Sequence, residues 1–311
     1  MDWHRHFMLV RIAPLIFVCL WATGFIGARL GLPYSEAGTF LSLRFALAFV
    51  LLTIIAMIYR APWPGMRHAL SAVLVGFFIH GVYLGAIFWV IDQGMPAGVS
   101  AVIVGLQPLV VAFIAAGWLG ELITKRHWVG LIIGIMGVFL VLYPKFDISG
   151  SGVTWLTILI AFIGMMAASV GTVLQKKVGA STDLRTGTAL QYLGAFLPVF
   201  LLALTSETGQ IDWTAEMTIA MVWSLFVLSF VAIFLLMWLI REGSVARVSS
   251  LMFLVPAVTS IMAYFMFGDR LIFIQFVGIV FSAAAVGLVA YSGGLRATNS
   301  PNPSNFKAKT P

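Results

Sequence analysis

Long apolar stretches alternate with short polar connections along almost the whole chain. The apolar stretches approach about 20 residues, which is the length that a helix needs to cross the hydrocarbon core of a bilayer. They predict ten membrane-spanning helices, at residues 12–30, 37–59, 69–91, 98–119, 127–143, 153–175, 187–205, 217–240, 245–268 and 272–291. The expected fold class is therefore an all-α integral membrane protein.

The composition supports this interpretation. Hydrophobic residues make up 61% of the chain and charged residues only 9%, whereas a soluble domain is about 45–50% apolar and about 25% charged. The first apolar stretch follows Arg5 and Arg11 as the core of a signal peptide would, but it is long and lacks a small-residue cleavage site, so we interpret it as a helix. Cys19 is the only cysteine, which excludes an internal disulfide.

The distribution of Lys and Arg predicts that both termini are cytoplasmic. Fourteen of the 18 basic residues fall in the ends and loops of one side, while the other side holds only Arg29, Lys145 and Arg270. Cytoplasmic loops of membrane proteins carry such an excess of basic residues. An odd number of helices would mix the two sets, so the bias favours an even number. The basic residues form no continuous stripe, and no nucleic-acid partner is expected.

The second half of the chain repeats parts of the first. A shift of 148 residues makes three pairs, which are Pro108 with Pro256, Gly120 with Gly268, and Gly130 with Gly278. Each half contains five predicted helices, and because five is odd, the two halves are expected to have opposite orientations in the membrane. Inverted repeats are typical of secondary transporters, in which two similar halves alternate around a site near the midplane.

These observations predict five segments. They are a cytoplasmic N-terminus (1–11), a first repeat (12–143), a linker (144–152), a second repeat (153–291) and a cytoplasmic tail (292–311). The tail is rich in Pro, Ser and Asn and is expected to be disordered.

Three parts of the sequence resemble the EamA family of the drug/metabolite transporter superfamily. They are the run LQPLVVAFIAAGWLGELITKRHWVGLIIGIMGVFLVL (106–142), its echo FLVPAVTSIMAYFMFGDRLIFIQFVGIVFSAAAVGLVA (253–290), and W-A-T-G-F (21–25) followed by L-R-F (43–45). The resemblance implies ten helices and the export of small metabolites. Members export aromatic amino acids, cysteine-pathway metabolites, and threonine or homoserine, so the resemblance leaves the substrate open.

Ionisable side chains inside the predicted helices are candidates for a transport site, because they are costly to place in hydrocarbon. Arg44 lies about two turns into the second predicted helix. Its guanidinium can hold a substrate carboxylate through two hydrogen bonds, or it can reach outward and bind backbone carbonyls and Glu36. His80 lies at the centre of the third helix and titrates near neutral pH, so it is a candidate for proton coupling. The alternative for His80 is a neutral imidazole with one hydrogen bond between helices.

Gln107, Trp21 and Tyr83 complete the predicted substrate-binding set. The amide of Gln107 both donates and accepts hydrogen bonds, and the two aromatic side chains can line a cavity, although most aromatic residues in such a chain face lipid or the interfaces. Pro108 removes a hydrogen bond to the carbonyl four residues earlier. It therefore either breaks the backbone at a binding site or produces a packing kink, and Pro256 presents the same alternatives.

Small residues mark two helix faces. Gly130 and Gly134 form a GxxxG pattern, and Gly278 with Ser282 occupies the equivalent positions in the second half. Such faces let helices approach closely. They predict either packing between the halves or contact between two copies in a homodimer.

The chain offers no catalytic constellation, metal site or cofactor motif. Four of the five histidines lie near helix ends, none of the 11 Asp and Glu residues occupies a helix centre, and a phosphate-binding Walker loop is absent. An exporter of organic cations would be expected to hold an embedded carboxylate. We therefore expect an inner (plasma) membrane transporter whose partners are a small-molecule metabolite and the lipid bilayer. Its predicted activity is export of amino acids or related zwitterions by alternating access, and the alternatives are an organic-cation exporter and an uncoupled, channel-like facilitator.

Overall fold

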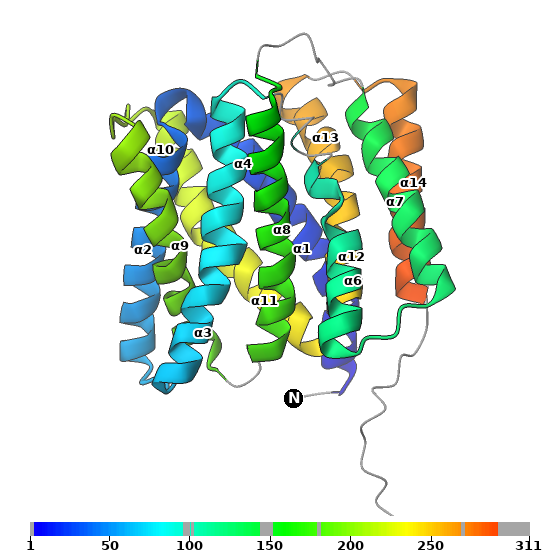
Figure 1. Cartoon of the computed structure of the whole chain (residues 1–311), viewed down its shortest axis with the longest axis horizontal. Coiled ribbons are helices and arrows are strands. Elements are labelled where there is room, and N and C mark those ends of the chain that lie inside the picture. Colours follow the sequence, from blue (N-terminus) through cyan, green and yellow to red (C-terminus); the bar gives the residue numbers. More distant parts are fainter. Residues whose placement is uncertain are drawn as a thin grey trace, which may run out of the picture.

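The computed structural model describes residues 3–95, 100, 103–143, 152–178, 182–268 and 271–291. Within these residues all regular elements are helices, apart from one isolated β-bridge between Ser35 and Ile211. The helices form a bundle in which α1 runs through the middle, behind α8 in Figure 1. The predicted tail (292–311) lies outside the described residues, as does the predicted linker except for Gly152.

The elements of the first half follow the predicted stretches. They are α1 (Trp3–Gly31), η1 (Leu32–Tyr34), α2 (Ala37–Ile58), α3 (Met66–Gly76), the π-helical segment η2 (Phe77–Val82), α4 (Tyr83–Asp92), α6 (Gln107–Leu119) and α7 (Lys125–Leu142). Helix α1 begins nine residues before the predicted start at residue 12. The difference arises because hydropathy detects only the apolar part of a helix, and no Gly or Pro precedes Pro14 to stop the helix earlier.

The elements of the second half follow one another in a similar order. They are α8 (Trp155–Val178), α9 (Leu184–Ser206), α10 (Ala215–Trp223), the π-helical segment η5 (Ser224–Ala232), α11 (Ile233–Glu242), α12 (Val245–Ser250), η6 (Leu251–Phe253), α13 (Leu254–Phe267) and α14 (Phe273–Tyr291).

Eight of the described helical stretches are long and apolar enough to cross a membrane. They are Ile12–Tyr34, Ala37–Ile58, Met66–Asp92, Lys125–Leu142, Trp155–Val178, Leu184–Ser206, Ala215–Glu242 and Val245–Met266. Two shorter apolar helices, Ile103–Leu119 and Phe273–Val289, accompany them. The chain is a multi-pass membrane protein.

Two predicted helices contain π-helical segments that hydropathy could not reveal. The prediction treats 69–91 and 217–240 as uninterrupted, whereas η2 and η5 interrupt them. A π-turn holds an extra residue, and it leaves the apolar composition of the stretch unchanged while it rotates the side chains that follow. Such segments occur frequently at functional sites.

Two further predicted helices are interrupted just before a proline. In the stretch 98–119, Leu106 forms a turn and α6 begins at Gln107, so Pro108 lies in a first helical turn, where its missing N–H is not needed. In the stretch 245–268, the 3₁₀-helix η6 ends at Phe253, and Pro256 is the third residue of α13. Each proline therefore lies in the first turn of a helix segment, and its role in a kink or at a binding site stays a prediction.

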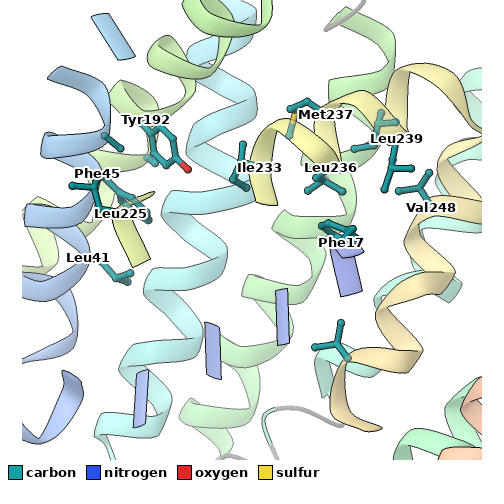
Figure 2. Close-up of a cluster of buried hydrophobic side chains, with 14 of the residues drawn as sticks. Phe17, Leu41, Phe45, Tyr192, Leu225, Ile233, Leu236, Met237, Leu239 and Val248 are labelled. Atoms are coloured by element: carbon teal, nitrogen blue, oxygen red, sulfur yellow. The ribbon is translucent and has the colours of Figure 1, made fainter. Parts of the chain in front are cut away.

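The largest buried cluster connects α1, α2, α9 and the α10–α12 region. Figure 2 shows Phe45 and Tyr192 on one side of it and Phe17, Leu236 and Val248 on the other. Phe17, Phe45 and Tyr192 are completely buried. Burial of such rings contributes strongly to the packing of the bundle.

Glycines determine how α7 and α14 pack. The two helices lie side by side at one end of the bundle (Figure 1). A Cβ atom on Gly278 would lie 2.6 Å from the backbone nitrogen of Val141, and one on Gly130 would lie 3.1 Å from the carbonyl oxygen of Ala285. Gly134 faces Phe253, and Ser282 faces Gly137. The small faces are therefore occupied by packing between the two halves of the chain.

Candidate functional site

A cavity between α1 and α4 brings together four of the five predicted substrate-binding residues. We call it the Arg44 cavity, and its lining includes Trp21, Phe25, Arg44, His80, Tyr83, Phe88, Leu228 and Ile233. Its volume is about 90 Å³, below the roughly 300–1,000 Å³ of sites for drug-sized ligands. In this conformation the cavity fits a small solute.

Arg44 is held in this cavity by one side of its guanidinium. The Nε atom donates a hydrogen bond of 2.9 Å to Ser229 Oγ, and the hydroxyl of Ser229 donates in turn to the carbonyl of Ser224 at 3.1 Å. The Tyr192 hydroxyl donates to the carbonyl of Ser229 at 2.9 Å. These contacts fix Ser229, which lies in the π-helical segment η5, and Ser229 fixes the orientation of the guanidinium.

The terminal nitrogens of Arg44 make no hydrogen bond with any residue that the structure describes. Arg44 is 8% exposed, and no carboxylate of the described residues forms an ion pair with it. The centroid of the Phe45 ring lies 5.7 Å from Arg44 Cζ. A buried charge without a counter-charge is costly. The arrangement leaves the two-pronged end of the guanidinium for an acceptor inside the cavity.

His80 lies in the second π-helical segment, η2, against the same aromatic side chains. Its ring stacks on Tyr192 at a centroid distance of 5.4 Å and an interplanar angle of 20°, and lies 6.5 Å from Phe45. His80 is 2% exposed, and its Nε2 atom has no hydrogen-bond partner among the described residues. The imidazole is therefore enclosed by aromatic side chains, and both interpretations of its role stay predictions.

Gln107 lines a second, smaller cavity that adjoins the first. We call it the Gln107 cavity; its volume is about 30 Å³, and its polar lining consists of Tyr83, Gln107, Thr172 and Ser249. Trp21 and Tyr83 line both cavities. These two aromatic side chains therefore form the boundary between them.

A third cavity continues toward the other end of α1. It has a volume of about 370 Å³ and is lined by residues that include Pro14, Trp238, Glu242 and Arg247, and we call it the Arg247 cavity. Val248 lines both this cavity and the Gln107 cavity. Along α1 the order is thus the Arg247 cavity at Pro14, the Gln107 cavity at Trp21, and the Arg44 cavity from Trp21 to Leu32.

The remaining predicted residues, which are the two prolines and the four small residues, do not line the Arg44 or Gln107 cavities. Pro108 follows Gln107 directly, and Pro256 follows the segment that contains Met252 of the Gln107 cavity. The small residues Gly130, Gly134, Gly278 and Ser282 belong to the packing of α7, α14 and η6. Among the described residues no three potential ligands gather to hold a metal ion.

Sequence reasoning missed the residues that support the site. Ser229 binds Arg44, and Gln191, beside His80, donates from Nε2 to Gln175 Oε1 at 2.7 Å. Gln175 and Gln191 are polar side chains in apolar helices, which was a usable signal, but each lies close to a predicted helix end. No sequence signal distinguishes Ser229 from other serines in these helices.

Two glutamates connect the halves at one end of the bundle. Glu207 accepts hydrogen bonds of 2.6 Å from the backbone nitrogens of Gly38 and Thr39 at the start of α2, and Glu36 accepts from the backbone nitrogens of Thr208 and Gly209. Carboxylates are favourable at helix N-termini. This reciprocal pair fixes the junction of α1 and α2 to the loop after α9.

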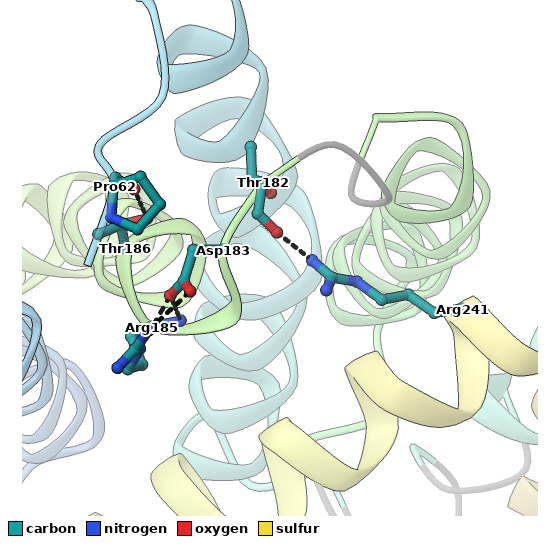
Figure 3. Close-up of polar contacts among 6 residues, drawn as sticks. All are labelled: Pro62, Thr182, Asp183, Arg185, Thr186 and Arg241. Carbon is teal, nitrogen blue, oxygen red and sulfur yellow. Dashed lines mark hydrogen bonds and ion pairs between the residues drawn. The ribbon is translucent and has the colours of Figure 1, made fainter. Parts of the chain in front are cut away.

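The opposite end of the bundle carries a different set of polar contacts, shown in Figure 3. Asp183 caps α9 and pairs with Arg185 at 2.9 Å, and Arg241 donates to the carbonyl of Thr182. The hydrogen bond from Arg185 lowers the pKa of Asp183 below its usual value. Glu121 accepts from the backbone nitrogens of Val245 and Ala246, and so joins the loop after α6 to the start of α12.

Comparison with known proteins identifies similar sequences over almost the whole chain. The model of the EamA-like transporter family matches residues 9–143 and again residues 155–291. The inner membrane transporter YedA of Escherichia coli is 27% identical over 283 residues, covering 88% of each chain. A probable amino-acid metabolite efflux pump of Escherichia coli is 24% identical over 279 residues, covering 86% of this chain and 90% of the pump.

A solved crystal structure shares the fold. It superposes with a TM-score of 0.74 at 16% sequence identity, and the match covers 91% of this chain and 96% of the other. This likeness extends the agreement from sequence to three-dimensional arrangement.

Proposed function

The chain belongs to the EamA-like transporter family, and from that premise we propose that it is a secondary transporter that exports small metabolites bearing a carboxylate, first among them amino acids and related zwitterions. The observation that carries this proposal is Arg44, a buried guanidinium whose terminal nitrogens have no partner among the described residues and which lines a small cavity. A carboxylate can accept both of its free hydrogen-bond prongs at once. Binding of the carboxylate would also neutralise the buried charge.

The walls of the Arg44 cavity suit the rest of such a solute. Trp21, Phe25 and Phe88 offer apolar surface, and Tyr83 offers a hydroxyl that makes no hydrogen bond with any described residue. No Asp or Glu of the described chain lines the Arg44 or Gln107 cavities. An organic cation would therefore meet a positive charge without a counter-charge, which disfavours the exporter of organic cations.

We further propose that the chain has ten membrane helices in two inverted repeats, 12–143 and 153–291. It lies in the inner (plasma) membrane, with both termini on the cytoplasmic side. Paired local features support the repeat. Each half has one π-helical segment, η2 or η5, and Gly120 and Gly268 both end their helices with left-handed φ angles of 66° and 70°. When η2 (77–82) is shifted by the same 148 residues that relate the glycines, it corresponds to residues 225–230, which lie within η5.

The arrangement of the three cavities supports alternating access. Trp21 and Tyr83 divide the Arg44 cavity from the Gln107 cavity, and Val248 lies between the Gln107 and Arg247 cavities. A channel needs a continuous path, whereas a carrier needs a site that is separated from at least one side at a time. The interrupted path favours a carrier over the channel-like facilitator.

Counterflow in proteoliposomes tests the proposal. The panel comprises labelled amino acids, nucleosides and organic cations, each with and without an imposed pH gradient, and it compares the natural chain with Arg44→Gln and with Arg185→Gln as a matched surface control. Saturable counterflow of an amino acid that Arg44→Gln loses and Arg185→Gln keeps is the expected result. Transport of organic cations alone would contradict the proposal.

A further inference from the structure

The Arg247 cavity is the largest of the three cavities and carries two opposite charges. Its volume of about 370 Å³ lies within the roughly 300–1,000 Å³ of small-molecule sites, whereas the Arg44 cavity, at about 90 Å³, is smaller. It lies at the lower end of α1 in Figure 1, beside Pro14. Among its described lining residues, Glu242 and Arg247 are the charged ones. In this conformation, this cavity has the most room for a whole amino acid.

Helix capping does not explain the charge of Glu242. This glutamate is the last residue of α11, where the final carbonyls favour a positive charge. Lys176 supplies that charge, because its Nζ atom donates to the carbonyls of Ile240, Arg241 and Gly243 at 2.7, 2.8 and 2.8 Å. An ammonium group has three N–H donors, so none is left for Glu242. The carboxylate accepts no hydrogen bond from any residue that the structure describes.

The charge of Arg247 is not a capping charge either. Arg247 lies in the first turn of α12, where the free backbone N–H groups favour a negative charge. Glu121 supplies that charge through its bonds to the backbone nitrogens of Val245 and Ala246. Within the described part of the chain, the guanidinium of Arg247 donates no hydrogen bond and forms no ion pair with Glu242. Both charges are therefore left for the contents of the cavity.

Most of the remaining lining is apolar. It includes Pro14, Leu15, Trp238, Leu239, Leu254 and Val286. A zwitterionic amino acid matches this combination, because its carboxylate suits the guanidinium fork of Arg247, its ammonium group suits the carboxylate of Glu242, and an apolar side chain suits the ring of Trp238. A solute with a single charge would leave one of the two protein charges unmatched.

We propose that the Arg247 cavity is a loading site, which binds a zwitterionic amino acid before the solute reaches Arg44, with Arg247 on the carboxylate and Glu242 on the ammonium group. The inference rests on the proposed function and adds a second site to it. In the proposed topology this end of the bundle faces the cytoplasm, from which an exporter takes its solute. The order of the cavities along α1 makes the Gln107 cavity the stage between the two sites.

Equilibrium binding of labelled phenylalanine to the purified full-length Arg44→Gln protein tests this directly, because the substitution removes the carboxylate site at Arg44. Two labelled analogues each lack one charge: phenylalanine amide has no carboxylate, and 3-phenylpropionate has no ammonium group. We expect phenylalanine to bind. The amide should bind about tenfold more weakly, as for the loss of a hydrogen bond between charged groups. Phenylpropionate should bind about fivefold more weakly, since Glu242 is exposed to solvent.

A second substitution in the Arg44→Gln protein assigns each charge. Arg247→Gln should abolish the preference for phenylalanine over its amide and keep the preference over phenylpropionate. Glu242→Gln should do the reverse. Equal weakening of all three ligands by both substitutions would show a structural disturbance and overturn the assigned roles. Arg67→Gln and Glu216→Gln, at exposed residues outside the cavity, are the matched controls and should leave all three affinities unchanged.

Proteoliposomes test whether the site loads the transport path. In the otherwise natural chain, Arg247→Gln should raise the apparent KM for a transported amino acid several-fold and leave the maximal counterflow rate unchanged, because saturating solute compensates for weaker loading. A lower maximal rate at an unchanged KM would contradict a loading role.

Failure of the inference and failure of the proposed function give different results. Absence of phenylalanine binding to the Arg44→Gln protein, or ligand preferences that neither second substitution changes, overturns the loading site alone. Displacement of phenylalanine by added phosphatidylethanolamine would assign the cavity to a lipid headgroup and also overturn it. Absence of amino-acid counterflow by the natural chain overturns the proposed function, whatever the binding experiment shows.

Discussion

The walls of the Arg44 cavity and the α7–α14 pair are built from the same apolar composition but in opposite ways. Around the cavity, η2 and η5 depart from regular helical geometry, and polar atoms such as His80 Nε2 lack partners among the described residues. In the α7–α14 pair both helices are regular, and Gly130 and Gly278 bring the backbones close enough to exclude an extra methyl group. From this difference we expect the walls of the cavity to bind solute and change shape, and the α7–α14 pair to hold the halves together.

Among the substitutions that test this comparison, Arg44→Gln is expected to have the largest effect on transport. Arg44→Gln removes the charge and the two-pronged donor, so transport of a carboxylate solute should fall by about 100-fold, in line with the loss of a desolvated charge pair. The melting temperature should change little, since the removed charge has no counter-charge among the described residues. Counterflow and thermal unfolding of the same preparations measure both quantities.

Arg44→Lys tests whether geometry matters in addition to charge. Lysine keeps the charge but has no planar fork, so we expect partial activity. If both Arg44→Ala and Arg44→Lys transported normally, the cavity would lose its functional role and the contrast between the two regions would disappear.

The second prediction concerns the helix pair. A Cβ atom on Gly278 would lie 2.6 Å from the backbone nitrogen of Val141, whereas one on Gly287 of the same helix would meet nothing within 4 Å. Overpacking of this kind costs about 1–3 kcal/mol. Gly278→Ala should therefore lower the melting temperature by about 5 °C, while Gly287→Ala should leave it unchanged.

For any folded Gly278→Ala protein, we expect the apparent KM for the solute to match that of the natural chain. A normal melting temperature with a changed KM would reverse the roles assigned to the two regions.

Ser229 provides a smaller and more specific test. Ser229→Ala removes the acceptor that orients Arg44 through Nε, so the apparent KM for a carboxylate should rise about tenfold, as expected for loss of the roughly 1.5 kcal/mol of one hydrogen bond to a charged group. Ser229→Thr retains a hydroxyl and should recover most of the affinity. An equal loss of affinity in both variants would indicate that packing of η5, and not the orientation of Arg44, was disturbed.

The sequence predicted the membrane fold and the residues of the cavity more successfully than the local geometry that joins them. Trp21, Arg44, His80 and Tyr83 were selected as polar or aromatic residues in apolar stretches, and all four line one cavity. Whether they bind solute stays a prediction. Hydropathy could not locate η2 and η5, because a π-helical segment changes the number of residues in a turn without changing composition.

The residues that support the side chains of the cavity could not be predicted from the sequence, for a related reason. Ser229 acquires its role from Arg44, which is 185 residues earlier in the chain. Gln191 donates to Gln175, which lies on a different helix. Such pairings depend on which helices lie side by side, and periodicity within a single helix does not contain that information.

The smallest effect is expected at the polar end shown in Figure 3, which belongs to neither region. Arg185 holds the pKa of Asp183 below its usual value, so the pair stabilises the folded state above the pKa of an unfolded aspartate. This contribution is lost as the pH falls through the lowered pKa of the folded state. Because both side chains are partly exposed, Asp183→Asn should shift the melting temperature at pH 7 by only about one degree, and by less near pH 3.

The most direct test of the central claim compares each transported acid with its own amide. Labelled amino acids and the corresponding amino-acid amides, which differ only in the carboxylate, are measured by counterflow with the natural chain and with Arg44→Gln. We predict that the natural chain carries at least one amino acid, that it carries the matching amide poorly, and that Arg44→Gln no longer distinguishes the two. Equal transport of acid and amide by the natural chain would contradict the claim that Arg44 binds the carboxylate.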